Sequence, residues 1–79
     1  MLRILVSLVV LVGLLFAGVK INEASQKELM KLKGVGRVSA EAIVEYRKKH
    51  GKFTSVNDLI NVKGIGSKTI KKNIDELEL

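Results

Sequence analysis

The sequence of 79 residues contains no cysteine, no proline and a single histidine. Without cysteine, no disulfide can support the fold, and the sequence excludes a lipoprotein leader, which needs a cysteine after its apolar run. His50 has no cysteine or second histidine with which to share a metal ion, so we expect no metal site and no cofactor. The sequence also offers no paired carboxylates and no set of nucleophile and base. These absences argue against an enzyme.

The first nineteen residues differ in composition from the rest. After Arg3, residues 4–19 carry no charge and only one polar side chain, Ser7. As a helix this run would span about 24 Å, which is less than the roughly 30 Å hydrocarbon core of a bilayer. A positive start, an apolar run of this length and a small residue at its exit are typical of a secretory signal. We therefore expect cleavage after Ala17 and a mature chain that starts near Gly18.

The alternative for residues 1–19 is an uncleaved membrane anchor that keeps Arg3 on the cytoplasmic side. The folded part is expected to start near Asn22, so an anchor would hold it against the bilayer with almost no linker, which favours cleavage. Both alternatives export residues 20–79, to the periplasm or the outer face of the cytoplasmic membrane. Membrane contact is expected only through residues 1–19, and only if they stay attached.

Residues 20–79 form one small and strongly basic domain. A chain of about sixty residues folds alone but with a marginal core, since it buries only about 60% of its unfolded surface. The formal net charge of the whole sequence is +6, and three of its eight acidic residues, Asp75, Glu76 and Glu78, lie in the tail, which leaves the rest of the domain more basic still. Such a basic field attracts polyanions and speeds encounter with them. A soluble surface that is merely rich in lysine would have the same net charge, so charge alone does not show that the domain binds a polyanion.

Two copies of one short pattern lie thirty positions apart. The identical pairs are Leu29 and Leu59, Lys33 and Lys63, Gly34 and Gly64, and Gly36 and Gly66; similar pairs include Leu32 and Val62, Val35 and Ile65, and Ser39 and Thr69. Glycines so placed free backbone N–H groups to face an anion at a helix start. One copy could be any tight turn. The repetition of the preceding helix, the turn and the following helix predicts two anion-binding sites in one domain.

The residues around the first copy predict two helices. Ser25 and Glu28 form a capping box that starts a helix reaching about Leu32. A longer helix is expected over about 38–49, and Gly51 suits the left-handed position that ends it.

The second half repeats this plan. Ser55 with Asp58 starts a helix over about 56–61, and a last helix runs over about 67–74. No stretch alternates with period two for long enough to predict a strand. We therefore predict an all-α fold of four or five short helices in a tandem helix-hairpin-helix arrangement, preceded by the leader. The expected core consists of Leu29, Leu32, Val35, Ala40, Ile43, Val44, Phe53, Val56, Leu59, Val62, Ile65, Ile70 and Ile74.

This pattern resembles the tandem helix-hairpin-helix DNA-binding domain, and more narrowly the ComEA family of exported competence proteins. The resemblance covers nearly all of residues 21–75, and the apolar leader separates the ComEA family from tandem domains that act inside the cell. It departs from the family at Lys33, where many such motifs have proline, and at Ile70, where the first repeat has Ala40. The matching segments are Ile21-Asn22-Glu23-Ala24-Ser25, Gly34-Val35-Gly36 with Ala40, Tyr46-Arg47 with Gly51-Lys52-Phe53, Asp58-Leu59 and Val62-Lys63-Gly64-Ile65-Gly66-Ser67-Lys68.

The resemblance implies a way of binding DNA. In such domains the hairpin N–H groups hold phosphates, and the next helix points its positive end at them. Phosphate contacts carry no base information, so binding is expected to be largely independent of sequence, with both strands of a duplex held through the minor groove. The backbone donors are expected at Val35, Gly36 and Arg37, and at Ile65, Gly66 and Ser67. The complete predicted site is Lys33, Gly34, Val35, Gly36, Arg37, Lys63, Gly64, Ile65, Gly66, Ser67, Lys68 and Lys71.

The function that the resemblance implies is an exported, non-enzymatic receptor for double-stranded DNA in natural transformation. Its partners would be duplex DNA, held through the phosphate backbone, and a DNA-uptake channel or pilus machinery. The alternative is an envelope interaction module. In that case the hairpins pack against another protein, and the basic surface meets an anionic polymer or membrane.

Overall fold

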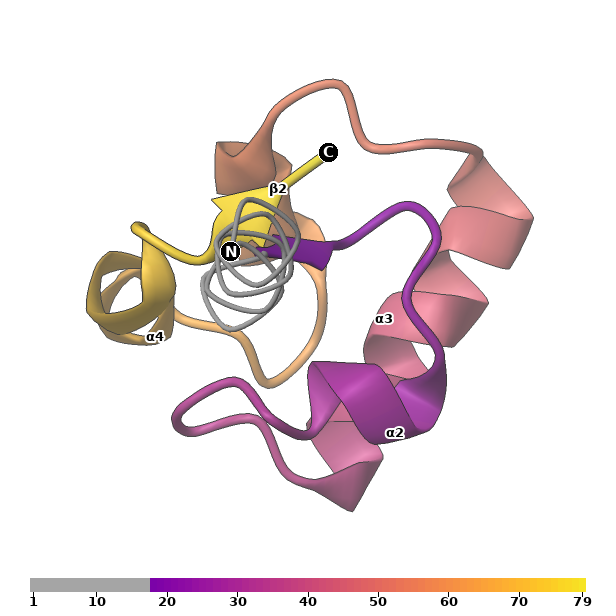
Figure 1. The fold of residues 1–79 in the computed structure, drawn as a ribbon. Helices are drawn as coiled ribbons and strands as arrows, with labels where there is room; N and C mark the ends of the chain where they lie inside the picture. Colours follow the sequence, from indigo (N-terminus) through magenta and orange to yellow (C-terminus); the bar gives the residue numbers. More distant parts are fainter. Residues whose placement is uncertain (1–17) are drawn as a thin grey trace, which may run out of the picture.

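The computed structural model describes residues 18–79, which fold into four helices and one pair of very short strands (Figure 1). This agrees with the predicted all-α class and with two helix-hairpin-helix units. The predicted leader lies outside the described residues, apart from Gly18 and Val19. No helix within residues 18–79 is long and apolar enough to cross a membrane. In chain order the elements are β1 (Val19–Lys20), α2 (Gln26–Leu29), α3 (Arg37–His50), the 3-10 helix η1 (Val56–Asn61), α4 (Ser67–Asn73) and β2 (Leu77–Glu78).

Helix α2 begins at the predicted cap but ends earlier than predicted. The Oγ atom of Ser25 accepts a hydrogen bond from the N–H of Glu28 at 3.2 Å. After Leu29 the chain continues in tight turns, in which the N–H of Leu32 donates to the carbonyl oxygen of Leu29 at 3.1 Å. The helix therefore stops at Leu29 rather than Leu32, because the chain already tightens toward the turn at Gly34, where φ is 77°.

Helix α3 extends one residue beyond the predicted range at each end. Its last turn is closed by Gly51, whose φ of 83° lies in the left-handed region and whose N–H donates to the carbonyl oxygen of Arg47 at 3.0 Å. The basic residues of that last turn complement the negative end of the helix. The opposite, positive end of α3 lies at the first hairpin.

The second unit uses a 3-10 helix where an α-helix was predicted. Both bonds of the capping box are present at Ser55 and Asp58. The Asp58 carboxylate accepts from the hydroxyl of Thr54 at 2.9 Å, from the N–H of Thr54 at 3.2 Å and from the N–H of Ser55 at 3.1 Å. These hydrogen bonds, that of the Thr54 hydroxyl foremost, lower the pKa of Asp58 from its ordinary value. Helix α4 ends at Asn73, one residue before the predicted end.

A parallel pairing of β1 with β2 joins the two ends of the domain (Figure 1). Val19 lies opposite Leu77, and the N–H of Ile21 donates to the carbonyl oxygen of Glu78 at 2.9 Å. These strands were not predictable from the sequence, because two residues cannot show an alternating pattern. The start of the fold expected near Asn22 was too late, because β1 begins at Val19, and the predicted boundary between residues 19 and 20 falls inside this strand.

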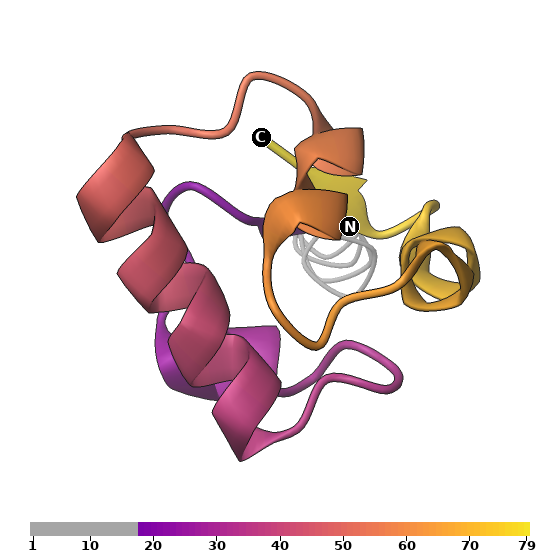
Figure 2. The same ribbon diagram turned by 180° about the vertical axis from the view of Figure 1, so that it is seen from behind.

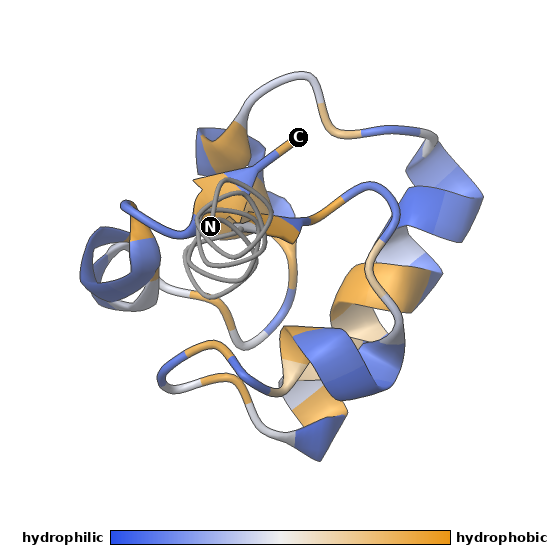
Figure 3. Cartoon of the chain, viewed as in Figure 1, coloured by the Kyte–Doolittle hydropathy of each residue, from blue (hydrophilic) through white to orange (hydrophobic). Residues whose placement is uncertain are grey.

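The core largely matches the predicted one. Val44 and Val56 are partly buried against it, whereas Ile74 is 48% exposed, so its prediction as a core residue is wrong. Ile74 comes after the last turn of α4, and Leu77 of β2 fills the core from there instead. Figure 3 shows α4 as mostly hydrophilic. The buried apolar residues are Ile21, Ala24, Leu29, Leu32, Val35, Ala40, Ile43, Phe53, Leu59, Val62, Ile65, Ile70 and Leu77, of which Ile21, Ala24 and Leu77 were not predicted.

Candidate nucleic-acid interface

The thirty-residue repeat of the sequence is also a repeat of the structure. Residues 29–41 and 59–71 have the same order of buried, half-buried and exposed side chains at every position. In Figures 1 and 2 the turn between α2 and α3 lies close to the turn between η1 and α4, at the same edge of the domain. The two predicted hairpins therefore lie side by side at one edge of the domain.

Each hairpin is closed by a hydrogen bond across its glycine. The N–H of Val35 donates to the carbonyl oxygen of Leu32 at 3.2 Å, and the N–H of Ile65 donates to that of Val62 at 3.1 Å. The turns require the left-handed backbone of Gly34 and its counterpart Gly64, where φ is 77° and 92°.

This closure corrects part of the predicted donor set. The side chains of Val35 and Ile65 are 6% and 5% exposed, and their N–H groups are already bonded inside the turns. Neither residue is free to hold a phosphate through its backbone N–H. Their role is to pack the tips of the hairpins onto the core.

The donors that remain lie at the starts of α3 and α4. The N-cap residues Gly36 and Gly66 have no side chain to satisfy the first turn, and no side-chain cap bond forms at either helix. Within residues 18–79, no internal acceptor meets the N–H groups of Gly36, Arg37, Gly66 or Ser67. A Cβ atom built on either N-cap glycine would meet nothing within 4 Å. Both sites are open to an approaching anion.

The basic side chains around the hairpins are not engaged with carboxylates. Among the described residues one ion pair forms, between Lys48 Nζ and Glu45 Oε1 at 3.9 Å, near the far end of α3. The predicted cationic residues of the site are exposed and have no such partner; they are Lys33, Arg37, Lys63, Lys68 and Lys71. An external anion would therefore meet positive charge that is not already neutralised.

The two hairpins are not electrostatically identical. Lys68 of the second repeat corresponds to Val38 of the first, and Lys71 corresponds to Glu41. Val38 is 81% exposed, next to the open start of α3, and the sequence analysis did not assign it to the site. Because Ser67 in turn stands where the first repeat has Arg37, the first turns of α3 and α4 carry one cation each, and the excess positive charge of the second repeat comes from Lys71 in place of Glu41.

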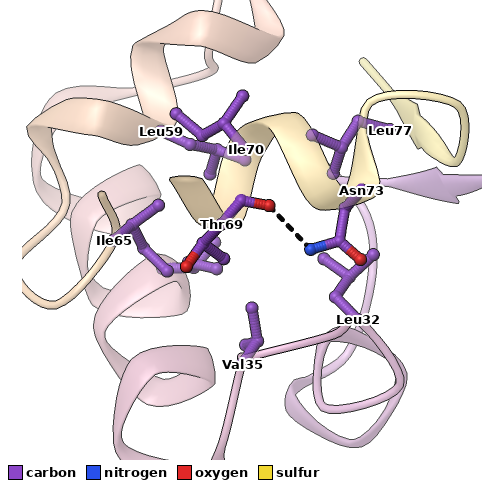
Figure 4. Close-up of a pocket in the computed structure, with 9 residues that line it drawn as sticks. Leu32, Val35, Leu59, Ile65, Thr69, Ile70, Asn73 and Leu77 are labelled. Atoms are coloured by element: carbon purple, nitrogen blue, oxygen red, sulfur yellow. Dashed lines mark hydrogen bonds between the residues drawn. The ribbon is translucent and has the colours of Figure 1, made fainter. Parts of the chain in front are cut away.

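The two turns are packed against each other's following helices. A Cβ atom on Gly34 would lie 3.5 Å from Thr69 Oγ1 of α4, and one on Gly64 would lie 3.2 Å from Ser39 Oγ of α3. Side chains of both units line a small cavity between them, among them Leu32 of the first unit and Ile70 of the second (Figure 4). These contacts between the two units fix the distance between the open starts of α3 and α4.

The described residues contain no group of three or more His, Cys, Asp or Glu side chains that could hold a metal ion. The ring of His50 packs on Tyr46 instead, with the ring centroids 4.3 Å apart. The ring of Tyr46 also stacks on Phe53, with the ring centroids 5.2 Å apart, so this tyrosine packs within the domain.

Comparison with known proteins gives the chain a family context. A family model described as the helix-hairpin-helix motif matches residues 16–78. The chain is 48% identical over 58 residues to an uncharacterized protein of Haemophilus influenzae, and 44% identical over 54 residues to ComE operon protein 1 of Bacillus subtilis. It is also 46% identical over 52 residues to the human endonuclease/exonuclease/phosphatase family domain-containing protein 1.

These matches cover most of this chain but less of its relatives. They span 72%, 68% and 66% of this chain, and 52%, 26% and 9% of the Haemophilus, Bacillus and human proteins respectively. The similarity to ComE operon protein 1 confirms the resemblance to the ComEA family that the two hairpins predicted. The match to the human protein concerns a small part of that protein.

Proposed function

This chain belongs to the helix-hairpin-helix family, and from that membership we propose that it binds double-stranded DNA through phosphate groups of both strands. The observation that carries the proposal is the pair of equivalent hairpins on one surface. Each leaves N–H groups free at a helix start, with open space in front of its N-cap glycine, Gly36 or Gly66, and unpaired cations beside it. A polyanion with regularly spaced charges fits such a pair of sites better than a single small anion does.

In this account one phosphate meets the N–H groups of Gly36 and Arg37, and a second meets those of Gly66 and Ser67. The cationic side chains around the hairpins add charge without reading bases, so binding is independent of sequence. If about four phosphates are neutralised, the logarithm of the association constant falls with the logarithm of salt concentration at a slope of about −3.6.

We further propose that the protein acts outside the cytoplasmic membrane as a non-enzymatic DNA receptor in natural transformation. The similarity to ComE operon protein 1 and the apolar run of residues 4–19 support this role. A receptor of this kind would hand DNA to an uptake channel or a pilus. Mass spectrometry of the protein isolated from cells should find a mature start near Gly18, and a full-length chain retained in membranes would contradict the cleavage.

The hairpin mechanism is tested by placing a carboxylate at each open helix start. In the double variant Gly36→Asp and Gly66→Asp the new side chains meet no neighbour within 4 Å at their Cβ atoms, so the fold should be kept. Each carboxylate would accept from the free N–H groups and repel a phosphate. We expect DNA binding to be abolished while the helical circular-dichroism signal is kept.

A matched control removes the same net charge elsewhere. Lys48→Gln with Lys52→Gln lowers the charge by two, as the double aspartate variant does, but at exposed positions near the far end of α3. This control should weaken binding only through the general field of the domain. If the two double variants lose affinity equally, the hairpins do not hold the phosphates. If the aspartate variant binds DNA as the wild type does, the hairpin mechanism is wrong.

A further inference from the structure

Asn73 is the one buried polar or charged residue among residues 18–79, with 2% of its surface exposed. Its side-chain amide is fully engaged. The Oδ1 atom accepts from the N–H of Lys33 at 2.8 Å, and Nδ2 donates to the carbonyl oxygens of Lys33 and Thr69, each at 2.8 Å. One side chain at the end of α4 thus holds both polar backbone groups of a residue 40 positions earlier, directly before the turn glycine Gly34.

The position of this asparagine in the repeat makes its hydrogen bonds informative. The counterpart of Asn73 in the first repeat is Ile43, which is fully buried in the core. An apolar residue at 73 would pack in the same way and would need no hydrogen bonds, whereas burying an amide costs free energy unless it is bonded. What the asparagine adds, relative to its counterpart, is the pair of bonds to Lys33.

We propose that Asn73 is a positioning residue for phosphate binding at the first hairpin. Through it, α4 of the second repeat fixes the entrance to the first turn and so sets where the N–H groups of Gly36 and Arg37 point. A turn that is already ordered loses less conformational entropy when a ligand binds. The inference rests on the proposed binding of DNA by the hairpins.

The hydrogen bonds from Asn73 to Lys33 form a clamp of the second repeat on the first, and the first repeat has no such clamp on the second. Ile43 has no amide with which to hold Lys63, and no hydrogen bond to the N–H of Lys63 forms within the described residues. The second turn relies on the contact of Gly64 with Ser39 and on the denser positive charge of α4. The first hairpin is therefore the preorganised site, and the second is the more strongly charged one.

The chain offers a matched control in a second asparagine clamp. Asn22 Nδ2 donates to the carbonyl oxygen of Phe53 at 3.0 Å, and the N–H of Phe53 donates to Asn22 Oδ1 at 2.7 Å. This pair has the same chemistry but holds the loop between α3 and η1. Figures 1 and 2 both show that loop at the opposite edge of the domain from the two turns.

The test compares Asn73→Leu and Asn73→Ala with Asn22→Ala in the chain from Gly18 to Leu79, which contains the whole described core. Binding to a short duplex is followed by fluorescence anisotropy over a range of salt, below the melting temperature of every variant. Both Asn73 variants should bind about tenfold more weakly, with a salt slope shallower by about 0.9, as expected for the loss of one phosphate contact. The Asn22 variant should keep the wild-type affinity and slope, even if its stability falls.

Equal affinities and slopes for the Asn73 and Asn22 variants would overturn the positioning role. Hydrogen exchange of the wild-type protein is a second test of the clamp and needs no variant. The Lys33 amide should exchange at least about tenfold more slowly than the Lys63 amide, because only the former has an internal acceptor. Equal exchange rates would show that the clamp is not formed. Failure of the wild type to bind any duplex would instead refute the proposed function, and the exchange rates would still report on the clamp.

Discussion

Gly64 of the second hairpin lies directly against Ser39 of α3, so that a Cβ atom on the glycine would stand 3.2 Å from the serine Oγ. Thirty residues earlier, Gly34 has the corresponding contact with Thr69, at 3.5 Å. Each hairpin is thus supported by the helix that follows the other one. Because the two repeats support each other in this way, the two proposed phosphate sites should form and be lost together.

The close contact at Gly64 predicts a strong effect of a single methyl group. Gly64→Ala must keep a φ of 92° and push Ser39 aside, so we expect the free energy of unfolding to fall by about 1–2 kcal/mol. Gly36→Ser is the control, because that site is open at an ordinary φ of −92° and serine is a favoured N-cap. Urea denaturation of both variants measures the two free energies of unfolding. An equal loss of stability would contradict the close contact at Gly64.

The pairing of β1 with β2 predicts that residues next to β1 contribute to the core. Ile21 is fully buried, so Ile21→Ala should lower the free energy of unfolding by about 2–5 kcal/mol. Ile74→Ala makes the same chemical change at a side chain that is 48% exposed and should cost less than about 0.5 kcal/mol. Thermal melts of the two variants in parallel provide the comparison. Similar losses would mean that β1 does not close the domain.

The Asp58 cap predicts a defined pH dependence. Its pKa is lower in the folded state than in the unfolded chain, so the ionised carboxylate stabilises the fold. That contribution is fully present above the unfolded-state pKa of about 3.9 and is lost as the pH falls through the lower folded-state value. The difference in melting temperature between the wild type and Asp58→Asn should therefore be constant near neutral pH and shrink below about pH 4. A difference that stays the same down to pH 2 would contradict this role of Asp58.

The exposed lysine on the first turn of α4 predicts a specific change in salt dependence. Lys68→Gln should weaken DNA binding and make the salt slope shallower by about 0.9, because one fewer phosphate is neutralised. Lys48→Gln removes the same charge from a residue near the far end of α3 that already pairs with Glu45. Its slope should stay close to the wild-type value. Identical slopes for the two variants would place the DNA elsewhere.

Local signals in the sequence were enough to predict most of the fold. The capping box at Ser55 and the left-handed glycine at 51 act over a few residues, and the repeat spacing fixed which helices form a pair. The 3-10 form of η1 and the early end of α2 were not predictable, because both depend on how the chain tightens toward each turn. The exposure of Ile74 was missed for a related reason. It depends on β2, a two-residue strand that exists only through its pairing with β1, which is far away in the sequence.

The candidate site was predictable in outline but not in detail. The repeat identified the glycines and the flanking cations, and the structure brings them to one surface. The sequence repeat could not reveal that the N–H groups of Val35 and Ile65 are used in hydrogen bonds that close the turns. Nor could it identify Asn73, whose partner Lys33 lies 40 positions away. The one available signal was an asparagine where the repeat would place an isoleucine, and its meaning depends on tertiary contact.

The most direct test of the central claim is fluorescence anisotropy of the chain from Gly18 to Leu79 on two unrelated duplexes of equal length, at low and moderate salt. The account predicts similar affinities for both duplexes and a log–log salt slope of about −3.6, the value for about four neutralised phosphates. Absence of binding at low salt, or a strong preference for one sequence, would contradict binding through paired hairpins.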